Sequence, residues 1–372
     1  MTDAPSMIDW ELAIRLGSRF AGDGPQVPAA AADEAVRELR AGAERSTALV
    51  RDFTGLVAAE HTAPVLVVDR AGWIRANADS FEKILDPIVT KLAEKKGAPS
   101  GIGKAVGSRV TGAELGFVLG FMGSKVLGQF DPFYGLNGAE RGTSERPRGR
   151  AGAGSDGAGP GTSEHGRLLL VAPNVVQVEQ ELEVDPGDFR LWVCLHEETH
   201  RVQFTAVPWM REHLYAQMTS LADSIEVGKT LEEGLKRVAG SLRGDGPSLL
   251  DLMSTPEQRE IIDRVTGVMS LLEGHADVVM DGVGPTVIPS VARIRRRFNQ
   301  RRKGVGTLDR LLRRVLGLDA KMAQYRDGAA FVRHVVDKVG MEDFNAVWAT
   351  AENLPSKAEI HDPDSWVARV HA

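Results

Sequence analysis

The sequence predicts a mainly α-helical protein with a small β-sheet, an α+β fold. Two long segments, residues 29–60 and 77–96, repeat apolar residues with the period of an amphipathic helix. Strand-like apolar runs are short and few. Glycine and proline clusters separate these segments and mark their ends. Together these observations favour several packed helices around a sheet of few strands.

The N-terminal part, residues 1–137, is predicted to be a layer of helices. We expect these helices at residues 7–20, 29–60, 77–96 and 109–130. The run 65–68 is predicted to be a strand or a packed loop, and 69–74 carries a turn signal. Gly112, Gly116 and Gly120 repeat every four residues, which predicts a flat helix face for close packing within the core.

The glycine-rich segment 98–107 does not predict a nucleotide site. A phosphate-binding loop needs glycine at its first position and serine or threonine at its last, and this segment has Ala98 and Ala105 there. The spacing of its glycines also misses the dinucleotide-binding pattern. We therefore predict a loop without a bound cofactor.

Residues 138–166 form a low-complexity segment of Gly, Ser, Arg and Pro. Such a segment has too few apolar side chains to offset the entropy of ordering, so we predict a flexible surface loop. His165 is assigned to this loop and not to a metal site. Residues 167–372 are predicted to form the catalytic region, beginning with two strand-like runs, 168–171 and 175–178.

The segment after these runs contains the candidate metal ligands and the candidate catalytic base. Asp185 and Pro186 are typical of a helix N-terminus. The helix that they start contains His196-Glu197-x-x-His200 in an apolar context. His196 and His200 lie one turn apart on the same helix face, so both imidazoles can bind one Zn²⁺. Glu197 projects beside the metal, where it can deprotonate a zinc-bound water.

A second helix is predicted to supply the third ligand. Thr255 as the N-cap, with Pro256 at the first helical position and Gln258 at the third, is a helix start signal. Downstream, Glu273 and Asp277 are four residues apart and share a face. We expect Glu273 to bind the metal and Asp277 to accept a hydrogen bond from a ligand histidine. His275 lies about 200° round the helix from Glu273, so we prefer it as a packed or supporting histidine.

These motifs resemble a known family. His-Glu-x-x-His followed by Glu-Gly-x-Ala-Asp resembles the gluzincin class of zinc metallopeptidases. The segments LHEETHRVQFTAVPWMREHL, LLEGHADVVMD and RFNQRRKG resemble an actinobacterial zincin-like family of unassigned function. Some of its members are provisionally labelled hydrolases, and others coenzyme F420 biosynthesis-associated proteins. The resemblance implies a zincin-like fold, zinc bound by His196, His200 and Glu273, and Glu197 as the catalytic base. It supplies no substrate, and nothing in these residues suggests a deazaflavin site.

The resemblance also implies an edge strand beside the metal helix that pairs with an extended substrate. We expect one of the runs 168–171 and 175–178 to be that strand. Catalysis of this kind also needs a donor to a developing oxyanion. Possible donors are Arg211, His213, Tyr215 and His275, and surface or supporting roles are at least as well supported for each.

Composition limits the other classes of function. The net charge is −6 over 372 residues, which does not suggest nucleic acid as a partner. The sole cysteine, Cys194, permits no intrachain disulfide and is predicted to be a small core residue. The most apolar run, 115–122, is too short to span a membrane, and the N-terminus lacks a signal-peptide pattern. We therefore expect a cytoplasmic enzyme that does not bind membranes.

One basic run stands apart from this composition. Residues 291–314 carry ten basic side chains against one acid, Asp309. Such runs can bind phosphate groups. Because this run has few aromatic residues, we favour internal ion pairs or a site for an acidic group of the substrate.

The sequence thus predicts a zinc-dependent hydrolase, in first place a metallopeptidase that cleaves a peptide or protein substrate. Two alternatives stay open. One is a zinc hydrolase that acts on a non-peptide amide. The other is a zinc-binding scaffold without peptidase activity, which the presence of Glu197 and the scarcity of cysteine disfavour. The oligomeric state is left open.

Overall fold

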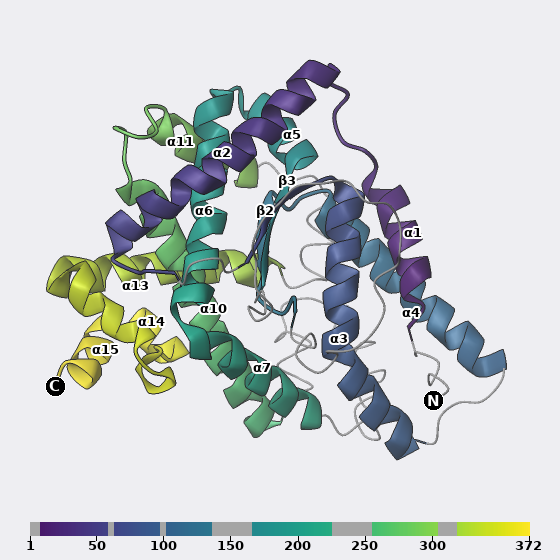
Figure 1. Cartoon of the computed structure of the whole chain (residues 1–372). Coiled ribbons are helices and arrows are strands. Elements are labelled where there is room, and N and C mark those ends of the chain that lie inside the picture. The colour runs from purple at the N-terminus through teal and green to yellow at the C-terminus, as the bar shows by residue number, and fades with distance from the viewer. Residues whose placement is uncertain (1–7, 59–62, 97–101, 136–165, 225–254, 304–317) are drawn as a thin grey trace, which may run out of the picture.

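The structure is a computed structural model, and it describes residues 8–58, 63–96, 102–135, 166–224, 255–303 and 318–372. Helices dominate it, as predicted, and a small sheet lies between two helical layers (Figure 1). In chain order the elements are α1 (Trp10–Ala21), α2 (Ala29–Thr54), β1 (Val65–Val68), α3 (Arg70–Lys96), α4 (Ile102–Gly123), β2 (Gly128–Asp131), β3 (Arg167–Val171), α5 (Ala172–Leu182), α6 (Pro186–Ala206), α7 (Pro208–Asp223), α10 (Pro256–Gly282), α11 (Val291–Lys303), α13 (Leu318–Phe344), the 3₁₀ turns η1 (Asn345–Trp348) and η2 (Ala351–Asn353), α14 (Lys357–His361) and α15 (Pro363–Val370).

The sheet has the strand order β1-β3-β2. β3 is central and pairs in parallel with β1 and antiparallel with β2. All residues of β3 are buried. Leu170 packs in a core cluster with α2, α5 and α6, whereas Leu169 and Val171 pack with α1, α3 and α4. The alternating side chains of β3 therefore bury both faces of the sheet.

The glycine repeat of α4 packs against α1, as predicted. A Cβ atom on Gly116 would lie 2.8 Å from the backbone oxygen of Ala13, and one on Gly120 would lie 2.6 Å from that of Gly17. The two backbones therefore approach more closely than any side chain allows. The most apolar run of the sequence, 115–122, lies in this helix pair. Among the described residues, no helix combines the length and the apolar character that crossing a membrane requires.

α6 starts as its sequence predicts and crosses the centre of the molecule (Figure 1). Asp185 Oδ1 accepts a hydrogen bond of 2.9 Å from the backbone N–H of Asp188, and Pro186 occupies the first helical position. Cys194 is fully buried against α2, where a Cβ atom on Gly42 would lie 3.0 Å from its sulfur. Its role as a small core residue is confirmed.

α10 packs against α13 through two facing glycines. A Cβ atom on Gly274 would lie 2.1 Å from the carbonyl carbon of Gly328, and one on Gly328 would lie 1.8 Å from the backbone oxygen of Ser270. This contact holds α10 firmly against the C-terminal helices. Trp348 and Trp366 are buried beside this contact, in one apolar cluster with Leu271 of α10 and Phe331 of α13.

Three sequence predictions of secondary structure were wrong. The helix expected over 109–130 ends at Gly123, and the chain then forms β2. The turn signal at 69–74 is a helix start, because Asp69 Oδ1 accepts a 2.6 Å hydrogen bond from the backbone N–H of Gly72. The run 175–178 is helical and belongs to α5, whose Asn174 side chain donates to the backbone oxygens of Gly123 and Val126.

Some predictions fall outside the described residues. The predicted flexible loop lies outside them over residues 138–165, which include His165. Residues 98–101 of the glycine-rich segment also lie outside them. The three-part division of the chain stays a prediction. The sheet nevertheless takes β1 and β2 from the N-terminal part and β3 from the region after the loop, so both parts share one core.

The α1–α4 contact makes a testable prediction. Gly116→Ala should destabilise the protein by about 1–3 kcal/mol, because the new methyl group overpacks the helix contact. The same substitution at Gly107, which has nothing within 4 Å of an added Cβ atom, should be neutral or stabilising by up to about 1 kcal/mol. Urea unfolding of both variants measures the difference, and equal effects would contradict the close packing.

Candidate metal centre

Two helix faces build the site. On α6, Trp192, His196, His200 and Phe204 follow one another at intervals of four residues, so they form one stripe along the helix. On α10, the corresponding stripe consists of Val265, Met269, Glu273 and Asp277. α10 begins with the predicted capping box, in which Thr255 and Gln258 bond to each other's backbone N–H. The metal motifs therefore lie in the middle of two facing stripes.

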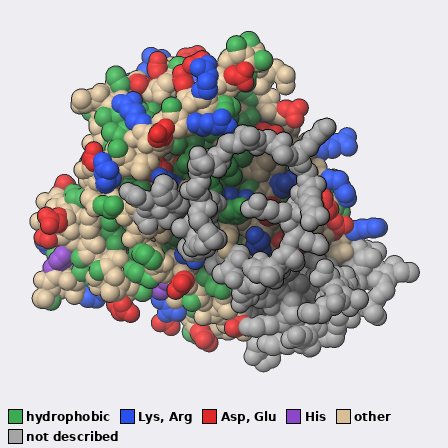
Figure 2. Space-filling view, viewed as in Figure 1, with side chains coloured by type: hydrophobic (Ala, Val, Ile, Leu, Met, Phe, Trp, Pro, Cys, Tyr) green, Lys and Arg blue, Asp and Glu red, His purple; other side chains and the backbone are tan. Residues whose placement is uncertain are grey.

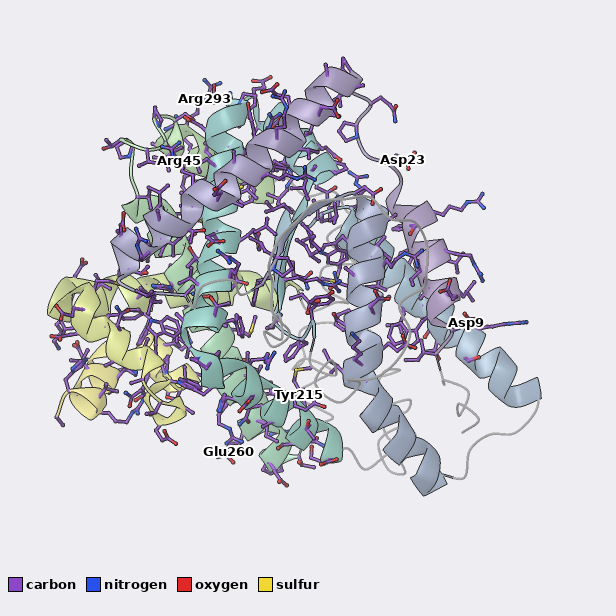
Figure 3. All side chains as sticks on the ribbon, viewed as in Figure 1. Asp9, Asp23, Arg45, Tyr215, Glu260 and Arg293 are labelled. Carbon is purple, nitrogen blue, oxygen red and sulfur yellow. The ribbon has the colours of Figure 1, made fainter. Side chains whose placement is uncertain are left out.

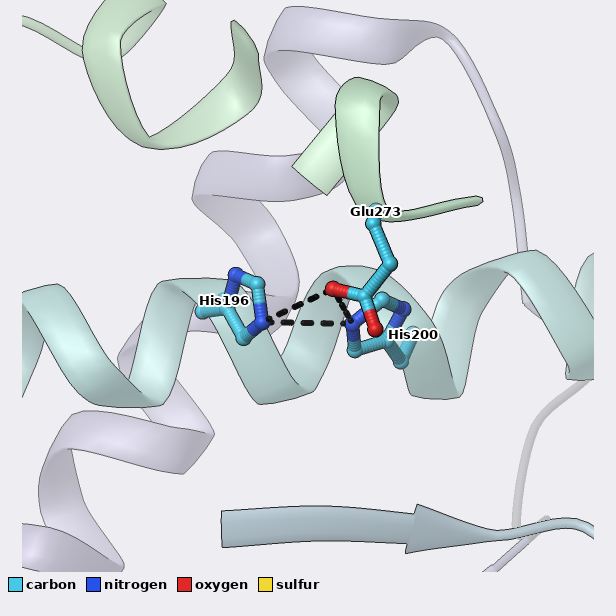
Figure 4. Close-up of side chains that lie close together, drawn as sticks. All are labelled: His196, His200 and Glu273. Carbon is cyan, nitrogen blue, oxygen red and sulfur yellow. Dashed lines mark hydrogen bonds and ion pairs between the residues drawn. The ribbon is translucent and has the colours of Figure 1, made fainter. Parts of the chain in front are cut away.

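The three predicted ligands meet between these helices (Figure 4). His196 Nε2 lies 3.3 Å from His200 Nε2, and each of them lies 3.5 Å from Glu273 Oε2. In a tetrahedral zinc site with bonds of about 2.0–2.2 Å, ligand atoms stand about 3.3–3.6 Å apart. The spacing of the three atoms therefore fits one zinc ion.

The chemistry of the donor atoms fits a cation as well. Glu273 Oε2 is buried and has no hydrogen-bond partner among the described residues. The Nε2 atoms of His196 and His200 face each other, an arrangement that a shared cation stabilises. Burial tends to lower the pKa of His200, but the negative charge of Glu273 outweighs it and raises that pKa to about 9. The carboxylate of Glu273 therefore favours a positive charge at this point.

Glu197 lies beside the ligands and is 6% exposed. Burial raises the pKa of its carboxyl group, the two histidines oppose that shift, and Glu273 adds to it. Gly128 of β2 packs directly against this side chain: a Cβ atom there would lie 2.5 Å from Glu197 Cγ and 3.0 Å from Oε1. Only glycine leaves room for Glu197 at this position.

Gln203 orients one of the ligands, a role that the sequence reading missed. Its Oε1 atom lies 2.9 Å from His200 Nδ1, and its Nε2 atom donates to the backbone oxygen of Leu272 at 2.9 Å. The same Nε2 atom lies 3.0 Å from His275 Nδ1. Gln203 Oε1 therefore faces the N–H of His200, which leaves Nε2 of that ring free to bind a metal. The spacing of three residues on a helix could have revealed Gln203.

Asp277 does not play its predicted part. Its carboxylate pairs with Arg295 and Arg333, which also pair with Asp281, and it does not orient a ligand histidine. The atom next to His196 Nδ1 is instead the sulfur of Met280, at 3.1 Å. Arg295 of α11 and Arg333 of α13 both bind the Asp277 carboxylate. The sequence around Asp277 does not indicate either contact.

His275 is fully buried behind Gln203, stacked on Phe344 with ring centroids 5.7 Å apart. Burial, reinforced by the charge of His200, lowers its pKa to about 3. This position confirms the preferred interpretation of a packed, supporting histidine. It also places His275 outside the pocket, so its alternative role as a donor to the reacting group was wrong.

A pocket of about 590 Å³ opens over the metal ligands and Glu197. Arg211, His213 and Tyr215, the possible oxyanion donors of α7, are not among the described residues that line it. Figure 3 labels Tyr215 on α7, where its ring lies 6.4 Å from that of Phe133. The polar side chains that do line the pocket, besides the ligands and Glu197, are Asn77, Lys125, Gln129, Asp277 and Arg295.

Three arginines in the described part of the basic run form ion pairs within the protein, as favoured. Arg295 pairs with two aspartates, Arg301 with Glu181, and Arg297 with Glu183. On the face drawn in Figure 2, basic and acidic side chains are interspersed over the described residues. Residues 304–314 of the run lie outside them.

Comparisons with known proteins agree with this geometry. Residues 8–367 match the family described as zincin-like metallopeptidase. The chain is also similar to a crystal structure from Chloroflexus aurantiacus, described provisionally as a hydrolase with a novel fold. The two chains are 30% identical, the match covers 98% of this chain and 99% of that one, and the TM-score is 0.66. No curated protein gives a significant match. These findings confirm the predicted zincin-like resemblance, and neither concerns coenzyme F420.

The site predicts how zinc affinity responds to substitution. His200→Ala should abolish stoichiometric zinc binding, because it removes a ligand. Gln203→Leu should weaken zinc binding by about 10–100-fold, since the ligand ring loses its hydrogen-bond partner. Competition with a chromophoric chelator measures both effects. The matched control is His213→Gln, which removes a histidine outside the pocket and should leave affinity unchanged. Unaltered affinity in Gln203→Leu would contradict the orienting role.

Proposed function

The chain belongs to the zincin-like metallopeptidase family, and from this premise we propose that it is a zinc-dependent hydrolase that cleaves peptide bonds. The single observation that carries the proposal is the position of Glu197 beside three donor atoms with the spacing of a zinc site. Three protein ligands leave a fourth position for water, which is the arrangement of catalytic zinc sites.

Zinc held by His196, His200 and Glu273 would supply Lewis-acid activation of a water and of the substrate carbonyl. The protein's own acid–base chemistry falls to Glu197. Its carboxylate accepts the proton of the attacking water and then donates it to the nitrogen of the leaving amine. Burial raises the pKa of Glu197, which suits a group that must both take up and release a proton near neutral pH.

The wall of the pocket formed by β2 supports a peptide as the substrate. We expected one of the runs 168–171 and 175–178 to supply a substrate-pairing edge, and this was wrong, because the first is the central strand β3 and the second is helical. Among the described residues, β2 pairs with β3 along one edge only, and its residues Gly128 to Phe130 line the pocket. Figure 4 shows a strand running beside α6 below the ligands. An extended peptide could add to the outer edge of β2 through main-chain hydrogen bonds.

A scaffold role without catalysis accounts less well for Glu197. A structural zinc site needs no base, yet this carboxylate is 6% exposed and packs beside the ligands, where burying a charge is costly. Retaining it there fits a catalytic role. The peptide substrate, the absence of nucleic-acid and membrane partners and the cytoplasmic location remain predictions.

Substitution of the base separates catalysis from metal binding. Glu197→Gln should keep one zinc per chain and lower peptide hydrolysis by at least about 10²-fold, since the proton acceptor is gone. A peptide mixture analysed by mass spectrometry measures hydrolysis, and elemental analysis measures zinc. Glu212→Gln, an exposed change on α7, is the control and should behave as wild type. Full activity of Glu197→Gln would refute the assignment.

The contact of β2 with the base gives a second test. Gly128→Ala should lower turnover by about tenfold or more while zinc affinity changes little, because the methyl group displaces Glu197 and not the ligands. Gly187→Ala provides the matched control, since the nearest atom to its added methyl group is 3.5 Å away. Equal turnover in both variants would show that the position of Glu197 does not depend on Gly128.

A further inference from the structure

The pocket is chemically different on the two sides of the metal ligands. Towards the start of α6 it is lined by Trp192, and the guanidinium of Arg295 lies 5.5 Å from that ring. Arg295 also pairs with Asp277, which lines the same side. This side therefore carries charged groups.

The side towards the end of α6 carries apolar side chains from four elements. We call this side the apolar arm; its lining residues are Phe130, Phe204, Leu214, Met218, Val265 and Met269. Phe130 and Phe204 stack with ring centroids 5.5 Å apart and close one wall. Leu214 is buried, whereas Met218, Val265 and Met269 remain partly exposed towards the pocket.

Helix periodicity brings the apolar arm next to the reacting bond. Phe204 is one turn beyond His200 on α6, and Met269 is one turn before Glu273 on α10. One helical turn advances about 5.4 Å, which is close to the distance from a backbone carbonyl to the end of a large side chain beside it. A residue adjacent to the bond at the metal can therefore reach this arm.

The direction of β2 fixes which side of the bond that residue occupies. β2 starts at Gly128, beside Glu197, and proceeds to Phe130, which stacks on Phe204. It thus runs from the catalytic base towards the apolar arm. A peptide that adds to β2 in the antiparallel sense runs the opposite way, from the arm towards the base. Its residue on the N-terminal side of the cleaved bond then faces the arm.

We propose that the apolar arm binds a large apolar side chain, aromatic or long aliphatic, on the N-terminal side of the bond that the protein cleaves. This inference rests on the proposed hydrolase function. Apolar side chains gain free energy when they leave water, and a charged side chain would lose its hydration in the same place. Thioether side chains adapt to different shapes, so Met218 and Met269 suit a site that accepts more than one large residue.

N-acetylated amino-acid hydroxamates test this proposal without requiring turnover. The hydroxamate binds zinc through its oxygens, and the amino-acid side chain lies on the N-terminal side of the anchoring group. With the zinc-loaded protein, N-acetyl-phenylalanine hydroxamate should bind at least about tenfold more tightly than N-acetyl-alanine hydroxamate, because its ring is buried in the arm. Isothermal titration calorimetry gives both dissociation constants and their ratio.

Variants in the arm identify where the preference arises. Met269→Asp on α10 and Met218→Asp on α7 each place a carboxylate in the arm and should reduce the ratio towards one. The ratio corrects for any loss of zinc, since both probes depend on the metal. Glu260→Gln is the matched control on α10, because that side chain is 72% exposed and points outward (Figure 3). It should keep the wild-type ratio.

The proposal is overturned if neither hydroxamate binds, if the wild-type ratio is near one, or if both arm variants keep the ratio. Peptide hydrolysis is scored separately. A clear preference for the phenylalanine probe without any peptide cleavage would leave the arm in place and refute the peptidase function. Cleavage of peptides without this preference would support the peptidase function and refute the role of the apolar arm.

Discussion

The crossing of α6 and α10 is the contact on which the site depends. It brings His200 of one helix within 3.5 Å of Glu273 on the other, although 73 residues separate them in sequence (273 − 200). The surrounding packing fixes this crossing from several directions. Gly274 lets α10 lie against α13, and Gly42 lets α2 lie against Cys194 of α6. A shift of about 1 Å at any of these contacts would change the spacing of the donor atoms.

Charge is the second constraint. Glu197 is buried and the Glu273 side chain is only 12% exposed, and the negative charge of Glu273 raises the pKa of Glu197. Without a metal, Glu273 is balanced by His200, whose pKa it raises to about 9. A divalent cation held by the two imidazoles and Glu273 would offset the charge of both carboxylates at once, which accounts for two acidic side chains so close together. The same argument explains why Gln203, a neutral group, can serve behind His200 without adding a third negative charge.

The sequence predicted the parts of the site that lie within single helices. Helix periodicity paired His196 with His200, and capping residues marked where α6 and α10 begin. The features that it missed depend on contacts between distant segments. β2 continues from a helix-like apolar run, and only its pairing with β3 makes it a strand. Asp277 had the right spacing to accept a hydrogen bond from a ligand histidine, but its carboxylate pairs with Arg295 and Arg333 instead. Valine-rich residues 175–178 favour a strand locally, whereas the buried Asn174 ties them into α5.

The coordination of zinc is the most direct test of the account. X-ray absorption at the zinc edge of the loaded protein reports the ligand atoms and their distances. We expect two imidazole nitrogens and oxygen donors at about 2.0–2.2 Å, with no sulfur neighbour. A sulfur atom at about 2.3 Å, or a spectrum without imidazole scattering, would contradict a centre built from His196, His200 and Glu273.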